Sequence, residues 1–300
     1  MKILITGAKG QLGTQIIKML ERMNSELGPI NNAYKNTEVI GIDVDQLDIT
    51  NLNQVREYIS KAKPEIIINC AAYTNVDACE TNEDLALKVN AIGPRNLAIV
   101  SEEIGAKLIH ISTDYVFAGN GTKPYREYDL TNPQSAYGNT KNAGEEFVKH
   151  FSSRFFIVRT AWLYGYYGNN FVKTIIKAAK EKGHLDVVDD QRGNPTNAED
   201  LAYHILKLAL TEEYGIYHCT GTGECSWYDF AVKIVKYANI TCTVSPVTSE
   251  KINRPAKRPA FSSLDNMMLR CTVGDEMRQW EEALKTFIEK EGENKWKELY

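Results

Sequence analysis

The segment that most constrains the fold is a short apolar run followed at once by three regularly spaced glycines. Residues 2–6 have the β-branched, apolar character of a buried strand, and Gly7, Gly10 and Gly13 come directly after them. Glycine tolerates the tight backbone that turns a strand into a helix. The spacing therefore predicts a strand–turn–helix unit whose helix N-terminus offers unpaired N–H groups to an anion such as a pyrophosphate.

The rest of the N-terminal half alternates short apolar runs with longer amphipathic stretches. Further strands are expected at residues 39–43, 66–69, 108–112 and 155–159, and helices at about 11–24, 51–62, 83–104 and 136–150. Such alternation is typical of βαβ units. It predicts an α/β fold with a doubly wound, Rossmann-like parallel sheet.

After about residue 164 the rhythm weakens and the chain becomes more helical. Helices are expected at 169–182, 198–211, 226–238 and 274–290, one strand near 215–220, and a Pro/Lys/Arg-rich loop at 245–263. We predict a dinucleotide-binding domain over residues 1–164 and a smaller, mainly substrate-binding region over 165–300. Parts of the second region, at about 190–220, are expected to return to the sheet.

Composition excludes several functional classes. The formal net charge of −4 and the isoelectric point near 5.8 argue against nucleic acid as a partner. The six cysteines form no C-x-x-C pair, which favours reduced thiols and gives no zinc site. No apolar run is long enough for a signal peptide or a membrane span. We expect a cytoplasmic protein that binds neither membranes nor a metal.

Tyr137 and Lys141 are the strongest candidates for chemistry. Residues four apart share one face of a helix, and a lysine ammonium there can lower the pKa of a phenol. Tyr203 and Lys207 repeat the spacing, but their amphipathic helical context favours packing and surface roles. The first pair is distinguished by Thr113, which ends a predicted strand, because ligands of doubly wound sheets gather at the carboxyl ends of strands.

The adenosine end of a dinucleotide is predicted less sharply. Asp43 ends the second predicted strand of the sheet and could bind ribose hydroxyls, or could be an ordinary turn residue. Residues 24–37 read as an insertion that lengthens its spacing from the glycines. Asp43 would repel a 2′-phosphate whereas Lys9 would attract one, so the cofactor is either NADPH or NADH.

Beyond single motifs, a series of segments in order resembles the extended short-chain dehydrogenase/reductase superfamily, and within it the dTDP-4-dehydrorhamnose reductase family. The segments span nearly the whole chain: GAKGQLG (7–13), NCAAYTNVDACE (69–80), NAIGPRN (90–96), STDYVF (112–117), YGNTK (137–141), RTAWLYG (159–165), GNNF (168–171), DQRGNPT (190–196) and RPAFSSLD (258–265).

The resemblance implies reduction of the C4 ketone of a dTDP-4-keto-6-deoxy sugar to dTDP-L-rhamnose, with hydride from NADPH or NADH. It implies a catalytic trio of Thr113, Tyr137 and Lys141, with Tyr137 donating the proton. The implied cofactor-binding residues are Gly7, Gly10, Gln11, Leu12, Gly13, Asp43, Asp48, Ile49, Ala71, Ala72, Tyr73, Asn90, Tyr137 and Lys141. The implied substrate-binding residues are Thr113, Asp114, Trp162 and Arg258, with Arg254 and Lys257 as further cations for the diphosphate.

Alternatives stay open at this point. Asn90 could be structural and Trp162 a core residue. Asp114 is followed by Tyr115 rather than by the second acid that related dehydratases carry, which disfavours dehydration, but a nucleotide-sugar epimerase is harder to reject.

A second class of function is a non-catalytic nucleotide-binding regulatory subunit. Some relatives pair through metal-bridged carboxylates near the first helix, where this chain has Gln15; we therefore assign no metal, while a homodimer stays open as one oligomeric state.

Overall fold

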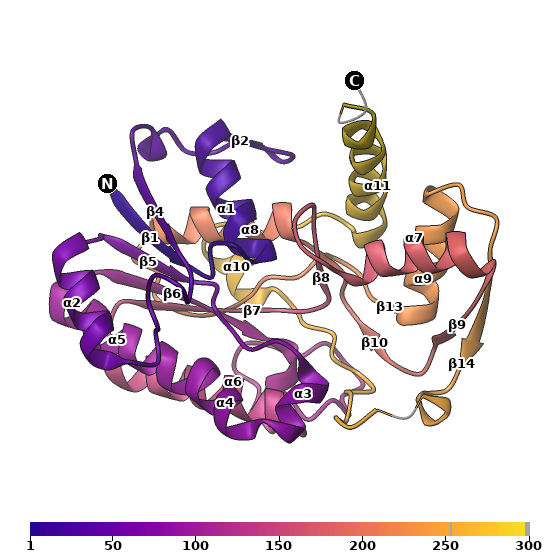
Figure 1. Ribbon diagram of the computed structural model, residues 1–300, viewed down its shortest axis with the longest axis horizontal. Coiled ribbons are helices and arrows are strands. Elements are labelled where there is room, and N and C mark those ends of the chain that lie inside the picture. The colour runs from indigo at the N-terminus through magenta and orange to yellow at the C-terminus, as the bar shows by residue number, and fades with distance from the viewer. Residues whose placement is uncertain (253, 298–300) are drawn as a thin grey trace.

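The centre of the protein is a six-stranded parallel sheet, seen in the computed structural model, which describes residues 1–252 and 254–297 (Figure 1). From one edge to the other the strands are β12 (Gly215–His218), β7 (Phe155–Thr160), β6 (Lys107–Thr113), β5 (Ile66–Asn69), β1 (Lys2–Thr6) and β4 (Glu38–Ile42). The order reverses at β1, so the switch point of the topology lies between β1 and β5, where ligands of such sheets bind. The predicted doubly wound α/β fold is confirmed.

Alternate residues of each strand enter two different cores. Ile3 and Ile5 of β1 face α1 (Gln11–Arg22) and α8 (Ala198–Ala209), which pack against each other on one side of the sheet. Leu4 faces the other side, which is covered by α2 (Leu52–Ala62), α5 (Gly93–Ile104) and α6 (Ala136–Phe151). Because both faces are covered, every residue of β5 is buried, and its sequence is almost wholly Ile.

The helix predicted over residues 83–104 is interrupted. It consists of α4 (Glu83–Leu87), the π-helical turn η2 (Lys88–Ile92) and α5, and it is preceded by the short helix α3 (Val76–Thr81). A Cβ atom at Gly144 of α6 would lie 2.2 Å from the Asn90 carbonyl oxygen, so α6 packs closely against the π turn. Single π turns of this kind are frequent at functional sites.

The second region packs around its own apolar cluster, to which α7 (Phe171–Lys182), α9 (Trp227–Tyr237) and α11 (Trp280–Lys297) contribute (Figure 1). Three two-stranded pairs accompany these helices: β9 (His184–Val188) with β14 (Thr243–Val247), β10 (Arg192–Gly193) with β13 (Cys225–Ser226), and β8 (Leu163–Tyr164) with β11 (Thr196–Asn197). The loop predicted from residue 245 therefore begins inside β14, and the helix predicted from residue 274 begins at Trp280. The short helix α10 (Met267–Cys271) contacts β12.

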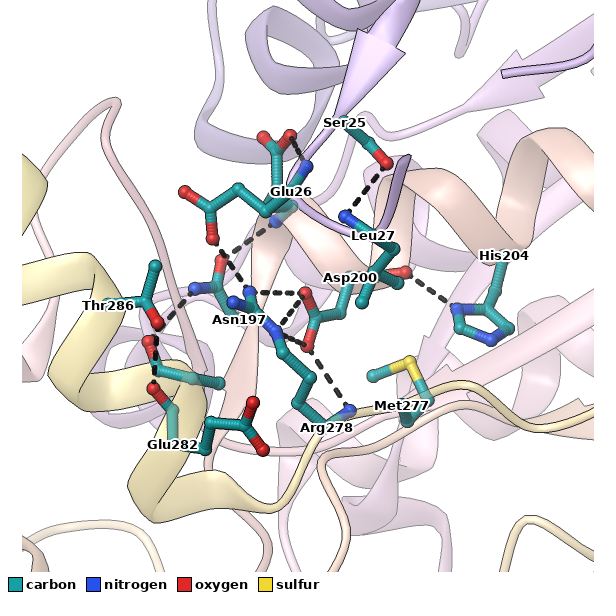
Figure 2. A network of polar contacts seen from close by, with 12 residues as sticks. Ser25, Glu26, Leu27, Asn197, Asp200, His204, Met277, Arg278, Glu282 and Thr286 are labelled. Atoms are coloured by element: carbon teal, nitrogen blue, oxygen red, sulfur yellow. Dashed lines mark hydrogen bonds and ion pairs between the residues drawn. The ribbon is translucent and has the colours of Figure 1, made fainter. Parts of the chain in front are cut away.

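Residues 24–37, interpreted as an insertion, form a hairpin of β2 (Asn24–Ser25) and β3 (Gly28–Pro29) followed by the 3₁₀ turn η1 (Asn32–Tyr34). Glu26 at the tip of the hairpin binds Arg278, just before α11, and Arg278 in turn binds Asp200 of α8 (Figure 2). β12 returns the later part of the chain to the central sheet, whereas the division of domains at residue 164 stays a prediction.

Among the described residues, none of the helices combines the length and the apolar character needed to cross a bilayer.

Candidate functional site

The glycine-rich turn forms a cradle in which side chains would not fit. Gly7 has a φ of +64°, and a Cβ atom there would lie 2.8 Å from the Ala71 backbone nitrogen. A Cβ atom at Gly13 would lie 2.3 Å from the Gly7 carbonyl oxygen. In the described part of the chain, no side chain caps the start of α1 and its first turn carries no acidic residue. The turn therefore leaves helix N–H groups open to an anion.

The neighbours of these glycines differ in what they can contact. Leu12 is 6% exposed and belongs to the core between α1 and the sheet, so its backbone is the part that faces the turn. The Gln11 amide nitrogen donates to the Leu163 carbonyl at 3.3 Å, and its oxygen accepts from Asn170 at 3.0 Å. Gln11 thus joins the glycine-rich turn to the segment that follows β7.

Asp43 lies at the end of β4, beside the same turn. Its carboxylate accepts from the Lys9 backbone N–H at 3.2 Å and from the Val44 N–H at 2.8 Å. The Lys9 ammonium binds Asp45 at 2.8 Å in a pair whose side chains are both more than half exposed. Such a pair is weak and exchanges readily with water or another anion. The structure therefore places one cation and two carboxylates beside the glycine-rich turn.

Asp48 and Ile49 are held by local contacts. The Asp48 carboxylate accepts from the Thr50 N–H at 2.9 Å, and the buried Ile49 side chain packs against Gly93. Asn96 donates to the carbonyls of Ile49 and Thr50, each at 3.0 Å. These contacts fix the backbone of the loop while burying the Ile49 side chain in the core.

Asn90 has a clear structural function. Its amide oxygen accepts from the Tyr73 N–H at 2.8 Å, and its nitrogen donates to the Tyr73 carbonyl at 3.1 Å and to the Thr140 hydroxyl at 3.2 Å. Asn90 therefore fixes the segment of Ala71, Ala72 and Tyr73 that follows β5, next to the first turns of α6.

Thr113 and Tyr137 are brought together by close packing of α6. Thr113 ends β6 and caps the 3₁₀ turn η3 (Asp114–Val116), while Ser135 caps α6 by accepting from the Gly138 N–H at 3.2 Å. A Cβ atom at Gly138 would lie 2.3 Å from the Tyr115 carbonyl oxygen, so only glycine permits this approach. The ring of Tyr137 packs edge-on against that of Tyr115, with centroids 5.4 Å apart.

The pKa values of Tyr137 and Lys141 differ from the expectation that the lysine lowers the pKa of the phenol. Burial raises the pKa of Tyr137, and the Thr113 hydroxyl lowers it only in part. Burial also lowers the pKa of Lys141 to about 8, opposed by the charge of Glu145. The Lys141 ammonium donates to the Ile111 carbonyl at 2.6 Å. Tyr137 is therefore a protonated phenol at neutral pH, because desolvation of the phenolate outweighs the hydrogen bond with Thr113.

Polar atoms without partners gather beside Thr113. Within residues 1–252 and 254–297, Oδ2 of Asp114, Oγ of Ser262 and Nη1 of Arg258 are buried without a hydrogen-bond partner. Thr113 donates to the other Asp114 oxygen at 2.9 Å, and burial raises the pKa of the Asp114 carboxyl to about 6. Unsatisfied buried polar atoms at the end of a strand are expected where a ligand completes the hydrogen bonding.

Arg258 lines a cavity of about 240 Å³ together with Tyr115, Gln134 and Lys257. It is held by Asp77 of α3, whose carboxylate accepts from Arg258 Nη2 at 2.9 Å. Arg254 lies close enough that its charge affects the pKa of Tyr115. Arg258 and Lys257 thus share a cavity with Tyr115, which lies two residues beyond the end of β6.

Trp162 belongs to the packing of the second region. It has a φ of +46°, and its ring stacks on that of Trp227 with centroids 3.5 Å apart. A Cβ atom at Gly193 would lie 2.7 Å from the Trp162 ring, which is therefore held on both sides. This fixed, half-buried ring is compatible with either reading, a core residue or a wall of a substrate site.

Sequence reasoning missed Ser262, Asp77 and the buried pair of Glu145 and Arg159. Ser262 stands inside the quoted segment 258–265, but that segment was used only for its resemblance and for Arg258, and a serine far along the chain from Thr113 carries no local signal of proximity to Asp114. Asp77 stands inside the quoted segment 69–80, and Glu145 stands four residues after the segment 137–141. An acidic residue inside or close to a motif was therefore the signal that could have pointed to them.

Comparison with known proteins bears on this arrangement. The family described as RmlD substrate binding domain matches residues 1–292. A crystal structure of a dTDP-4-dehydrorhamnose reductase from Clostridium acetobutylicum is 52% identical, with a TM-score of 0.91 over 96% of this chain and 99% of that one.

The chain belongs to the RmlD substrate-binding-domain family. A Bacillus anthracis member, a dTDP-4-dehydrorhamnose reductase solved in complex with NADP, is 45% identical with a TM-score of 0.90, covering 96% of this chain and 99% of that one. The dTDP-4-dehydrorhamnose reductase of Aggregatibacter actinomycetemcomitans is 39% identical over 95% of this chain and 97% of its own length. The resemblance to this family that the sequence segments indicated is confirmed.

Proposed function

We propose that this protein is an NADPH- or NADH-dependent reductase that converts the C4 ketone of a dTDP-4-keto-6-deoxy sugar, dTDP-4-dehydrorhamnose, into the alcohol of dTDP-L-rhamnose. The observation that carries the proposal is the convergence of Thr113, Tyr137 and Lys141 at the carboxyl end of β6. The likeness to reductases of that name over nearly the full length supports it.

The residues of the chain fit a dinucleotide. The cradle at Gly7 and Gly13 excludes side chains, and the open N–H groups of α1 suit a pyrophosphate. Asp43, beside the same turn, would bind the hydroxyls of the adenosine ribose. When bound, the reduced nicotinamide would supply the hydride, and Lys141 would bind the hydroxyls of the nicotinamide ribose.

The proton comes from Tyr137. Because burial raises the pKa of the phenol, it stays protonated across the physiological range, which is the form a proton donor needs. Reduction would turn the C4 carbonyl oxygen, which stays bound to C4, into an alkoxide that is far more basic than a phenolate, so proton transfer from Tyr137 to this oxygen is favourable. The Thr113 hydroxyl polarises the same oxygen and fixes its position. The buried carboxyl of Asp114 accepts a sugar hydroxyl through its unpartnered oxygen.

Arg258 binds the diphosphate. Its guanidinium is nearly buried, is held in place by Asp77, and keeps one nitrogen without a partner among the described residues. A fixed planar guanidinium binds phosphate oxygens through two parallel hydrogen bonds. Because the chain as a whole is acidic, the substrate diphosphate requires a local positive charge, which Arg258 would supply.

The test is direct. Purified protein is mixed with NADPH or NADH and dTDP-4-dehydrorhamnose, and the absorbance of the reduced dinucleotide is followed while the sugar product is identified by NMR. Oxidation of the dinucleotide with formation of dTDP-L-rhamnose is expected. Absence of oxidation with both dinucleotides, in protein that binds either one, would contradict the proposal and favour a nucleotide-binding regulatory subunit.

A homodimer and a cytoplasmic location are parts of the same proposal. Apolar side chains are exposed on α4 and at the end of α6, at Leu85, Leu87 and Phe151, which favours a contact between copies. All six cysteines are free thiols in the described structure, as in proteins of a reducing compartment. Light scattering of the purified protein tests the dimer.

A further inference from the structure

A buried ion pair lies behind the helix face that carries Tyr137 and Lys141. Glu145 stands one turn beyond Lys141 on α6, and its carboxylate is bound by Arg159 of β7 through three contacts of 2.9, 3.2 and 2.7 Å. The two side chains are 0% and 2% exposed. Since a buried pair of this kind gives little net stability compared with apolar packing, stability alone does not account for its presence.

The same carboxylate reaches the strand that ends at Thr113. The Ser112 hydroxyl donates to Glu145, and the neighbouring Ile111 carbonyl accepts from Lys141 at 2.6 Å. Two consecutive residues of β6 are therefore tied to two consecutive turns of α6. Thr113, the next residue, is held at a fixed position relative to Tyr137 by these two contacts.

Glu145 is also the carboxylate that faces Lys141. The titratable and charged groups around the ammonium are Tyr137 and Glu145 from α6, His110 from β6, Cys70 after β5 and Arg159 from β7. Burial lowers the pKa of His110 well below its usual value and raises that of Cys70 to about 12, so both are uncharged at neutral pH. The negative charge that opposes desolvation of Lys141 thus comes from Glu145.

We propose that Glu145 is a positioning residue for the reduction: through Ser112 it fixes the strand end that carries Thr113, and one helical turn from Lys141 it supplies the buried negative charge that accompanies the lysine. The inference rests on the proposed function. It assigns Glu145 no contact with substrate or cofactor.

The experiment compares Glu145→Gln with Glu146→Gln. The glutamine keeps the size of the side chain and an acceptor for Ser112 but removes the charge, while Glu146 is a half-exposed neighbour that binds Lys149. Because Glu145→Gln leaves Arg159 without its counter-charge and could unfold the chain, the double variant Glu145→Gln/Arg159→Met is prepared as well. The pKa of Lys141 is read by NMR with lysine labelled with carbon-13 at Cε, assigned through Lys141→Arg.

Removal of Glu145 is expected to lower the pKa of Lys141 by about one unit or more, in any folded single variant relative to the wild type and in the double variant relative to Arg159→Met alone, since loss of the Arg159 charge by itself raises that pKa. The alkaline limb of kcat/KM moves to lower pH by the same amount in the same comparisons, and Glu146→Gln changes neither. An equal pKa of Lys141 in the folded double variant and in Arg159→Met would overturn the inference. The NMR titration needs no turnover, so a failure of the proposed function, seen as an inactive wild-type protein, is recognised separately.

Discussion

Replacement of Arg278 by Met should expose how the N-terminal hairpin, α8 and the C-terminal helix are held together. Arg278 donates to Asp200 at 2.5 Å and to Glu26 at 2.8 Å, and the two carboxylates are 1% and 6% exposed (Figure 2). Glu26 keeps the Lys290 ammonium at 3.0 Å, whereas every hydrogen bond recorded to the Asp200 carboxylate in the described part of the chain comes from Arg278.

The loss in free energy of unfolding expected for Arg278→Met follows from this difference between the partners of Asp200 and those of Glu26. Leaving one buried charge without its partner costs about 3–5 kcal/mol. For a chain of this length that corresponds to a fall in Tm of roughly 6–10 °C, at about 2 °C per kcal/mol. Burial already raises the pKa of Asp200 in the folded state, and loss of Arg278 raises it further. The penalty is therefore largest at alkaline pH, where folding must keep Asp200 ionised, and shrinks as the pH falls and the carboxyl is protonated.

Thermal and denaturant unfolding at mildly alkaline and mildly acidic pH measure both quantities. Lys285→Met on the exposed face of α11 is the control and should stay within about 0.5 kcal/mol of the wild type. The double variant Arg278→Met/Asp200→Leu should recover most of the loss. A penalty for Arg278→Met below about 1 kcal/mol, or one that is independent of pH, would refute the reasoning.

Three further predictions concern the site. Gly144→Ala should lower turnover and stability together, because its Cβ would meet the Asn90 carbonyl at 2.2 Å and displace α6; kinetics and Tm measured side by side check this. Burial raises the pKa of Asp114 to about 6, so its ionised carboxylate should accept a sugar hydroxyl only above that pH. KM should therefore rise as the pH falls through about 6, and Asp114→Asn should remove this pH dependence of KM. Asp45→Asn should release Lys9 and shift dinucleotide affinity a few fold toward NADPH over NADH in calorimetric titrations, and an unchanged ratio would contradict that role for Lys9.

The parts of the fold that follow from local pattern were predictable. The apolar strands and the glycines after residue 6 carry their structure in their own sequence, because a strand buried on both faces must be apolar and a positive φ at Gly7 requires glycine. The prediction of Tyr137 as the proton donor also rests on local pattern, because its distance from Lys141 and its place in a helix after a strand are both visible in the sequence.

The rest depends on contacts between distant segments. The π turn at Lys88–Ile92 arises where Gly144 lets α6 approach, which no local propensity at residues 88–92 encodes. β9 and β14 are short, half-exposed strands that exist because they pair with each other. The late start of α11 reflects Arg278, whose side chain and backbone N–H both bind Asp200 and hold the segment before Trp280 out of a helix.

The most direct measurement is the kinetics of Tyr137→Phe. If the phenol is the proton donor, turnover should fall by about 10²-fold or more while the dissociation constants of NADPH and NADH stay close to those of the wild type. Turnover that is unaffected, or a loss of dinucleotide binding large enough to explain the lost activity, would contradict the role of Tyr137 as the acid.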